Sequence, residues 1–173
     1  MTNSIFNQIV QFLKNKQVPF TIKEHAPTPT SQDSARERNE SINIGAKALL
    51  VKTKHQFHLC VIPANLKLDT KKVKKLLKSN KLRFATKEEL FDLTGLKPGS
   101  VPPFGHILGI DMIIDQKQFL EKKIAFNAGS LTKSIIMKSQ DFKQAIEPKI
   151  EDISQDIWWS PPSDKTSETF INK

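Results

Sequence analysis

One segment of the chain combines residues that can shape a substrate pocket from backbone groups. Residues 95–105 read GLKPGSVPPFG and contain three glycines and three prolines. Glycine allows φ values that other residues avoid, whereas proline fixes φ and removes an N–H donor. The remaining N–H groups of such a loop therefore point in defined directions and can form a pocket wall. A rigid connector without a ligand is the alternative interpretation.

Lys47 and the residues around Asn127 are two further candidates. Lys47 lies in the segment GAKALLVK, and if residues 46–53 form a strand, its ammonium group shares one face with apolar residues. A lysine at the edge of a pocket can hold a phosphate or the carbonyl end of a substrate, but it can also extend its charged end into water. Residues 126–130 read FNAGS, which lets a ligand approach the main chain but also suits an ordinary turn.

The sequence lacks the motifs of several other catalytic chemistries. It contains no zinc motif, P-loop, dinucleotide fingerprint or nucleophile elbow. Cys60 is the only cysteine and lies in an apolar run, which favours a buried, unreactive thiol over a nucleophile. We therefore expect no metal and no cofactor.

Length and composition favour a single globular domain. A chain of 173 residues is long enough to bury a core without disulfides or metal, and no apolar run is long enough to cross a membrane. No secretory signal is visible, so the expected location is cytoplasmic. The formal net charge of +9 indicates attraction to polyanions, with nucleic acid as the first candidate partner, or simply a well-solvated surface.

The candidate residues must be positioned by interspersed helices and strands. Spacing and capping residues predict helices over residues 4–16, from Thr30 through Arg38, from Asp69 or Thr70 through Lys78, from Thr86 through Leu93, near 116–120, and from a Ser139 cap through Ile146. Strands are predicted over residues 20–24, 46–53, 56–63, 107–114, 123–126 and 134–138. This irregular order predicts an α/β mixed (α+β) single domain with a mixed, largely antiparallel sheet and packed helices.

One predicted helix is unusually basic. Residues 71–78 carry five lysines around a short apolar stripe. The helix can lie along a phosphate backbone, or it can be a surface helix with a solvated face. Because it has no interleaved aromatic residues for base stacking, the second interpretation is favoured.

Three elements, taken in order, resemble the YbaK/prolyl-tRNA editing family. They are residues 45–51 (GAKALLV), 94–105 (TGLKPGSVPPFG) and 126–129 (FNAG). The family comprises free-standing deacylases and the insertion domain of bacterial prolyl-tRNA synthetases. The resemblance implies a YbaK-like aminoacyl-tRNA editing domain over residues 1–147. Residues 148–173 are then expected to form a C-terminal tail that is partly disordered unless Trp158 and Trp159 dock.

The resemblance also implies an activity. It implies trans-acting hydrolysis of the ester bond in mischarged aminoacyl-tRNA, with a small amino acid such as Ala, Cys, Ser or Thr attached to a tRNA for proline. An aminoacyl ester is already activated, so water can attack it if the carbonyl is positioned and its developing charge meets N–H donors. The implied partner is the acceptor end of aminoacyl-tRNA, with an aminoacyl-tRNA synthetase as a second candidate and no membrane.

Roles for individual residues follow from the same resemblance. Lys47 matches the family's functional lysine, and we expect it to hold the terminal nucleotide, while N–H groups near Gly99 and Ser100 polarise the carbonyl. The expected substrate-binding residues are Gly95, Pro98, Val101, Pro102, Phe104, Asn127, Ala128 and Gly129. The loop is closer to that of family members that act on alanine-sized groups, whereas the Lys47 segment is closer to that of cysteine-removing members. The identity of the amino acid that is removed therefore stays open.

Two other functions compete with this interpretation. A non-catalytic tRNA- or RNA-binding module would use the basic helix for phosphate contacts and would show no ester turnover. A regulatory domain would bind a small amino acid or nucleotide in the same pocket without RNA.

Overall fold

The computed structural model describes residues 3–28 and 30–156. The helices are α1 (Ile5–Asn15), α2 (Ser31–Arg38), α3 (Thr70–Leu76), α4 (Lys87–Thr94), α5 (Gly105–Leu108) and α6 (Ser139–Ile146), with short 3-10 turns η1 (Ile42–Ile44) and η2 (Gln116–Phe119). The strands are β1 (Phe20–Glu24), β2 (Ala46–Thr53), β3 (Phe57–Pro63), β4 (Leu66–Leu68), β5 (Leu82–Phe84), β6 (Asp111–Asp115), β7 (Lys123–Asn127), β8 (Lys133–Lys138), β9 (Lys149–Glu151) and β10 (Ser154–Asp156).

The strands of this part of the chain form three sheets. The largest has the order β5-β2-β3-β6-β9, in which β2 pairs antiparallel with β3 and β5, while β3–β6 and β6–β9 are parallel. The order β1-β8-β7 forms an antiparallel sheet, and β10 pairs antiparallel with β4. An isolated bridge between Gly45 and Ala125 links the two larger sheets. The predicted mixed α+β fold with largely antiparallel pairing is therefore confirmed.

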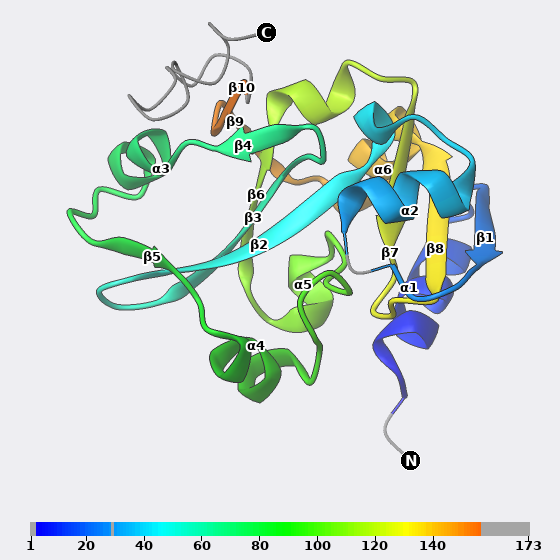
Figure 1. Cartoon of the computed structure of the whole chain (residues 1–173), viewed down its shortest axis with the longest axis horizontal. Coiled ribbons are helices and arrows are strands. Elements are labelled where there is room, and N and C mark those ends of the chain that lie inside the picture. Colours follow the sequence, from blue (N-terminus) through cyan, green and yellow to red (C-terminus); the bar gives the residue numbers. More distant parts are fainter. Residues whose placement is uncertain (1–2, 29, 157–173) are drawn as a thin grey trace, which may run out of the picture.

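Alternation along β3 places apolar side chains on both faces of the large sheet. Leu59 and Val61 belong to the main core, which α1, β7 and β8 also line, whereas Cys60 and Ile62 belong to a second core under α3. Burial raises the pKa of the Cys60 thiol to about 12, as expected for an unreactive cysteine. Figure 1 shows α3 and β5 at one end of the molecule and α1 and β1 at the other.

Most helix starts follow the capping residues in the sequence. The side chains of Thr30, Asp69 and Thr86 accept hydrogen bonds from the first-turn amides of α2, α3 and α4, and Thr86 forms the expected capping box with Glu89. The predicted Ser139 cap is wrong, because Ser139 is already helical. Its hydroxyl donates instead to the carbonyl of Glu121 at 2.6 Å.

The predicted strand over residues 107–114 is also wrong in its first half. Residues 105–108 form α5, Gly109 has a positive φ of 70°, and the strand β6 begins only at Asp111. A run of apolar residues does not distinguish a buried helical turn from a strand, and here the glycine ends the turn.

The fold also extends beyond the predicted boundary at residue 147. β9 adds to the edge of the large sheet, and β10 pairs with β4. Described residues up to Asp156 are therefore paired with other strands, and the extent of the editing domain itself stays a prediction. The rest of the expected tail, with Trp158 and Trp159, lies outside the described residues.

Gly105 is a position where the fold does not tolerate a side chain. A Cβ at this position would lie 2.4 Å from the carbonyl oxygen of Ile110 and 2.7 Å from Cβ of Met112. Because backbone must move to relieve this overlap, we expect Gly105→Ala to lower the free energy of unfolding by about 3 kcal/mol, measured by urea unfolding. Gly109→Ala is the matched control, since no atom lies within 4 Å there and only backbone strain of about 1 kcal/mol is expected. If the two variants lost equal amounts of unfolding free energy, the overlap at Gly105 would not be the cause.

Candidate active site

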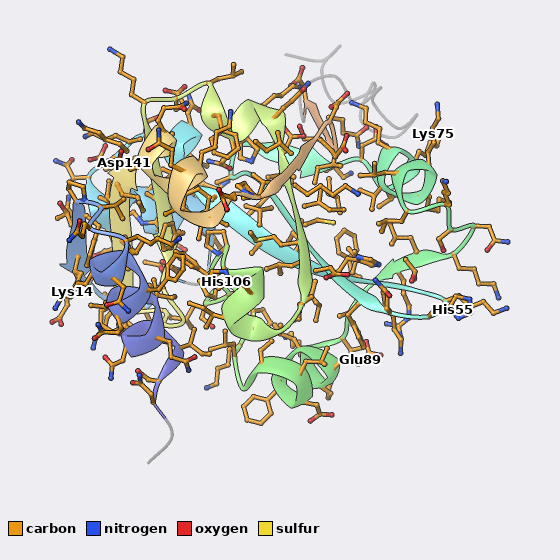
Figure 2. All side chains as sticks on the ribbon, turned by 180° about the vertical axis from the view of Figure 1, so that it is seen from behind. Lys14, His55, Lys75, Glu89, His106 and Asp141 are labelled. Atoms are coloured by element: carbon orange, nitrogen blue, oxygen red, sulfur yellow. The ribbon has the colours of Figure 1, made fainter. Side chains whose placement is uncertain are left out.

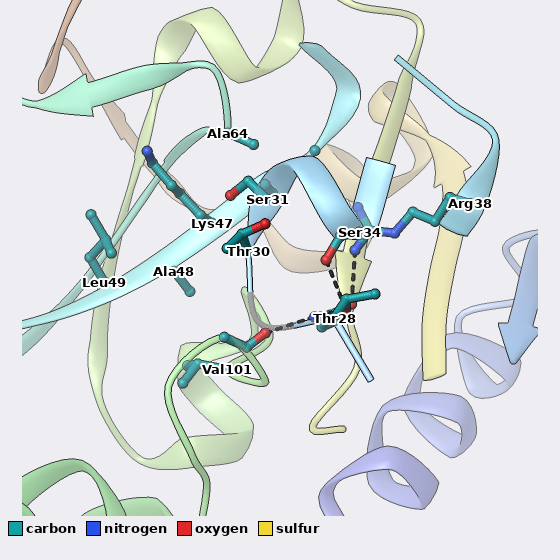
Figure 3. A pocket seen from close by; sticks show the side chains of 14 residues that line it. Thr28, Thr30, Ser31, Ser34, Arg38, Lys47, Ala48, Leu49, Ala64 and Val101 are labelled. Carbon is teal, nitrogen blue, oxygen red and sulfur yellow. Dashed lines mark hydrogen bonds between the residues drawn. The ribbon is translucent and has the colours of Figure 1, made fainter. Parts of the chain in front are cut away.

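A cavity of about 180 Å³ lies between α2, the first residues of β2 and the glycine- and proline-rich loop (Figure 3). Its lining residues are Thr28, Thr30, Ser31, Ser34, Arg38, Gly45, Ala46, Lys47, Ala48, Leu49, Ala64, Gly99, Val101 and Asn127. Hydroxyl groups come from α2 and the loop before it, and cations come from Lys47 and Arg38. The described lining contains no carboxylate, histidine or cysteine.

Lys47 lies on β2 opposite Ile62 and is partly buried. This burial lowers the pKa of its ammonium group, because the charged form loses hydration. Among the described residues, no carboxylate forms an ion pair with Lys47. Figure 3 shows the side chain extending from one side of the cavity, with Arg38 on the other side. A partly dehydrated ammonium of this kind can bind an anion or a carbonyl oxygen.

Arg38 is the last residue of α2 and is only 4% exposed. Its Nε donates to Oγ of Ser134 at 2.9 Å, and its Nη2 donates to Oδ1 of Asn127 at 3.0 Å. Burial lowers the pKa of the guanidinium to about 10, and no carboxylate of the described residues forms an ion pair with it. Its Nη1 has no acceptor in this part of the chain and lies near Gly45, where a Cβ would be 3.7 Å away. This nitrogen of a buried cation therefore lies beside Gly45, and both residues line the cavity.

Asn127 connects the strand β7 to the loop and to α2. Its Nδ2 donates to the carbonyl of Gly99 at 2.8 Å and to Oγ1 of Thr28 at 3.3 Å. The hydroxyl of Ser34 also donates to Oγ1 of Thr28, at 2.9 Å. Since buried hydrogen bonds of this kind restrict the groups they join, Asn127 holds the loop at a set distance from Arg38.

The loop amides differ in their availability. The N–H and hydroxyl of Ser100 both donate to the carbonyl of Lys97, at 3.1 and 2.7 Å. The Ser100 amide is thus engaged within its own turn, so the expectation of donors near Gly99 and Ser100 stays a prediction that depends on the neighbouring amides. The N–H groups of Gly99 and Val101 have no acceptor among the described residues, and both residues line the cavity. Gly99 reaches this geometry with a φ of 86°.

Several predicted site residues do not line the cavity. Phe104 and Ala128 are completely buried in the main core, where the Phe104 ring packs 5.3 Å from that of Phe126. Gly95 ends α4, the carbonyl of Pro102 accepts from Phe104, and the amide of Gly129 donates to Ser100. Pro98 lines a neighbouring hollow of about 160 Å³ that shares Gly99 and Val101 with the cavity. Lys47, Gly99, Val101 and Asn127 are thus the predicted residues that the fold brings together at the cavity.

Sequence reasoning missed the contribution of α2. Thr28, Thr30, Ser31, Ser34 and Arg38 line the cavity, and none was a candidate. The available signal was composition, because Ala35 is the only apolar residue of this helix. A helix without an apolar face that lies between two strands must pack through polar contacts.

The described ranges offer no metal centre and no membrane-spanning helix. No group of three or more His, Cys, Asp or Glu side chains is arranged to hold a metal ion. No helix there combines the length and apolarity needed to cross a membrane.

Comparison with known proteins decides the family. The model of the aminoacyl-tRNA editing domain matches residues 25–145, which include all the residues that line the cavity. The chain belongs to the aminoacyl-tRNA editing family. The multifunctional Ser/Thr-tRNA deacylase ProXp-y of Escherichia coli K12 is 26% identical over 148 residues, which cover 83% of this chain and 89% of the relative. The prolyl-tRNA editing protein ProX of Acetoanaerobium sticklandii is 21% identical over 145 residues, covering 80% and 88%.

Solved structures share the fold of this editing domain. A crystal structure of a hypothetical protein matches with a TM-score of 0.78 at 22% identity, covering 86% of this chain and 99% of that one. A proposed trans-editing enzyme for prolyl-tRNA synthetase matches with a TM-score of 0.75 at 19% identity, covering 90% and 99%. The predicted family, the fold class and the enzyme class, an aminoacyl-tRNA deacylase, are confirmed.

Proposed function

We propose that this editing domain acts in trans on tRNAs that carry a small, wrongly attached amino acid with a hydroxyl group, serine or threonine. The supporting observation is the cavity itself, which has about 180 Å³ of space and hydroxyl and cationic groups around it. A site that hydrogen-bonds a substrate hydroxyl discriminates strongly against analogues that lack it, because its buried polar groups are then left unpaired. The relative ProXp-y is a Ser/Thr-tRNA deacylase, which supports the same choice.

The reaction needs a positioned carbonyl and an oxyanion site. In the proposed mechanism, the N–H groups of Gly99 and Val101 donate to the ester carbonyl oxygen, and water attacks the carbonyl carbon. The C–O bond to the ribose then breaks, the ribose oxygen takes a proton, and the free amino acid leaves. Because the described lining offers no carboxylate or histidine as a base, the adjacent ribose hydroxyl of the substrate relays the proton from the attacking water.

The two cations have separate roles in this proposal. Lys47, at the side of the cavity, holds a phosphate of the terminal nucleotide, which positions the ester without contacting the reacting bond. Arg38, whose Nη1 lies beside Gly45 in the cavity lining, donates to the hydroxyl of the amino acid. Since the guanidinium is held by Ser134 and Asn127, this donor is preorganised before the substrate arrives.

A panel of esterified tRNAs tests the proposed function. We expect the protein to release serine and threonine from mischarged tRNA faster than alanine or cysteine, and to leave correctly charged prolyl-tRNA intact. The tRNA for proline is the first carrier to test, because the relative ProX is a prolyl-tRNA editing protein. The assay measures release of radiolabelled amino acid against the uncatalysed rate. No release above that rate from any ester, with tRNA still bound, would favour a non-catalytic RNA-binding module instead.

Association with a synthetase stays a prediction, as does the cytoplasmic location.

A further inference from the structure

A second concave region lies at the end of the large sheet, away from the cavity. One hollow of about 440 Å³ is lined by Lys52, Thr53, Lys54, Lys74, Asn80, Lys81, Leu82 and Arg83. A neighbouring hollow of about 320 Å³ shares Thr53, Lys54 and Asn80 with it and adds His55, Gln56, His58, Leu77, Lys78 and Ser79. Figure 2 shows His55, at the turn between β2 and β3, and Lys75, on α3, at the same end of the molecule.

This region is strongly positive. We call Lys52, Lys54, Lys74, Lys78, Lys81 and Arg83 the basic surface; these six residues line the two hollows, and no Asp or Glu lines either one. Glu89 is the carboxylate that pairs with part of it, at 3.4 Å from Lys52 and 2.8 Å from Arg83. Four lysines of the basic surface form no ion pair among the described residues. The whole chain's excess of positive charge is therefore partly concentrated here.

The basic surface and the cavity are joined by one strand. β2 begins at Ala46, passes the cavity at Lys47 and reaches the hollow of the basic surface at Thr53. The six residue steps from Lys47 to Thr53 span about 20 Å of extended strand. Between the two ends lies Phe84, which pairs with Val51, is 52% exposed, and lines the hollow next to the cavity. An exposed aromatic ring on this path offers a face on which a nucleotide base can stack.

We propose that the basic surface binds backbone phosphates of the tRNA acceptor stem, while the acceptor end passes Phe84 and places its ester in the cavity. This inference rests on the proposed function for the identity of the RNA. Flexible lysines bind phosphates as point charges without reading sequence, so the contact supplies affinity for tRNA rather than selection of the amino acid. A second binding region about 20 Å from the ester also explains how a cavity this small can act on a substrate as large as tRNA.

Two charge-reversed variants test this surface. Lys74→Glu with Lys81→Glu, and independently Lys54→Glu with Lys78→Glu, each change two lysines of the basic surface. We expect each pair to weaken binding of uncharged tRNA on the order of tenfold at low salt, and to lower the slope of log affinity against log salt by about 1.4–1.8. The matched control is Lys14→Glu with Lys122→Glu, which makes the same change in net charge at exposed positions on α1 and just before β7.

Substrate length separates this surface from the cavity. With mischarged tRNA, we expect the basic-surface variants to raise KM and keep kcat. With a seryl ester on a short CCA oligonucleotide, they should match the wild type, because that substrate does not reach the basic surface. The proposal would be overturned if both variant pairs kept the tRNA affinity and the salt slope of the wild type. It would also be overturned if the basic surface bound anionic vesicles in place of tRNA. If the wild-type protein released no amino acid, the proposed function would fail. The tRNA affinities of the variants would still show whether the basic surface binds tRNA.

Discussion

Lys47→Ala is expected to lower kcat/KM for deacylation of mischarged tRNA by about 10²-fold, because the terminal nucleotide loses the cation that positions its ester. The loss should be a loss of activity and not of fold, since Lys47 is only partly buried and forms no ion pair with a described carboxylate. Single-turnover release of serine measures it. Lys67→Ala, at an exposed lysine of β4, is the control and should retain full activity.

The pH dependence of this effect has a defined sign. Burial lowers the pKa of Lys47, so its ammonium loses its proton at a lower pH than an exposed lysine does. The ratio of the wild-type rate to the Lys47→Ala rate should be highest at neutral pH and fall toward one as pH rises. Uncatalysed hydrolysis by hydroxide adds equally to both rates, so it is measured without enzyme at each pH and subtracted before the ratio is taken. Wild-type rates for Lys47→Ala on every ester tested would remove the lysine from the mechanism.

Arg38→Met is expected to lower the rate of deacylation of seryl- and threonyl-tRNA by about 10²-fold, because a preorganised donor at the cavity is removed. Its effect on folding should be small. The guanidinium is buried without a described carboxylate partner, so its burial is costly, and a methionine of similar length keeps the packing. We expect the free energy of unfolding to change by no more than about 1 kcal/mol, measured in urea.

Two variants give this prediction its controls. Arg36→Met changes the same residue type on the same helix, but the Arg36 side chain is 77% exposed, so activity should be unaffected. Arg38→Lys keeps the charge but loses the planar fork of the guanidinium and its Nη1 beside Gly45, and it should lose most of the activity. If Arg38→Met lost activity only in proportion to its loss of folded protein, the residue would be structural. If it lost serine and alanine release equally, it would not recognise the hydroxyl.

Much of the fold was predictable from local signals. The pair of strands β2 and β3 and the capping box at Thr86 follow from patterns within a few residues. The short strands β4, β5, β9 and β10 were not predicted, because each has only three residues and depends on partners far away in the sequence. The apolar run before β6 was misread for a related reason, since its first half is helical only in the context of Gly109.

The candidate site also has a part that local sequence predicts and a part that depends on the tertiary structure. By itself, the sequence determined the residue types of the chemistry: a lysine at the start of a strand, a loop whose prolines remove donors, and an asparagine after an apolar strand. Only the tertiary structure decided which amides stay available, because the N–H of Ser100 is used within its own turn. It also decided that Arg38 lines the cavity. A polar helix carries no periodic signal for its buried side, so its contacts with Ser134 and Asn127, about ninety residues away along the chain, appear only once the sheets have assembled.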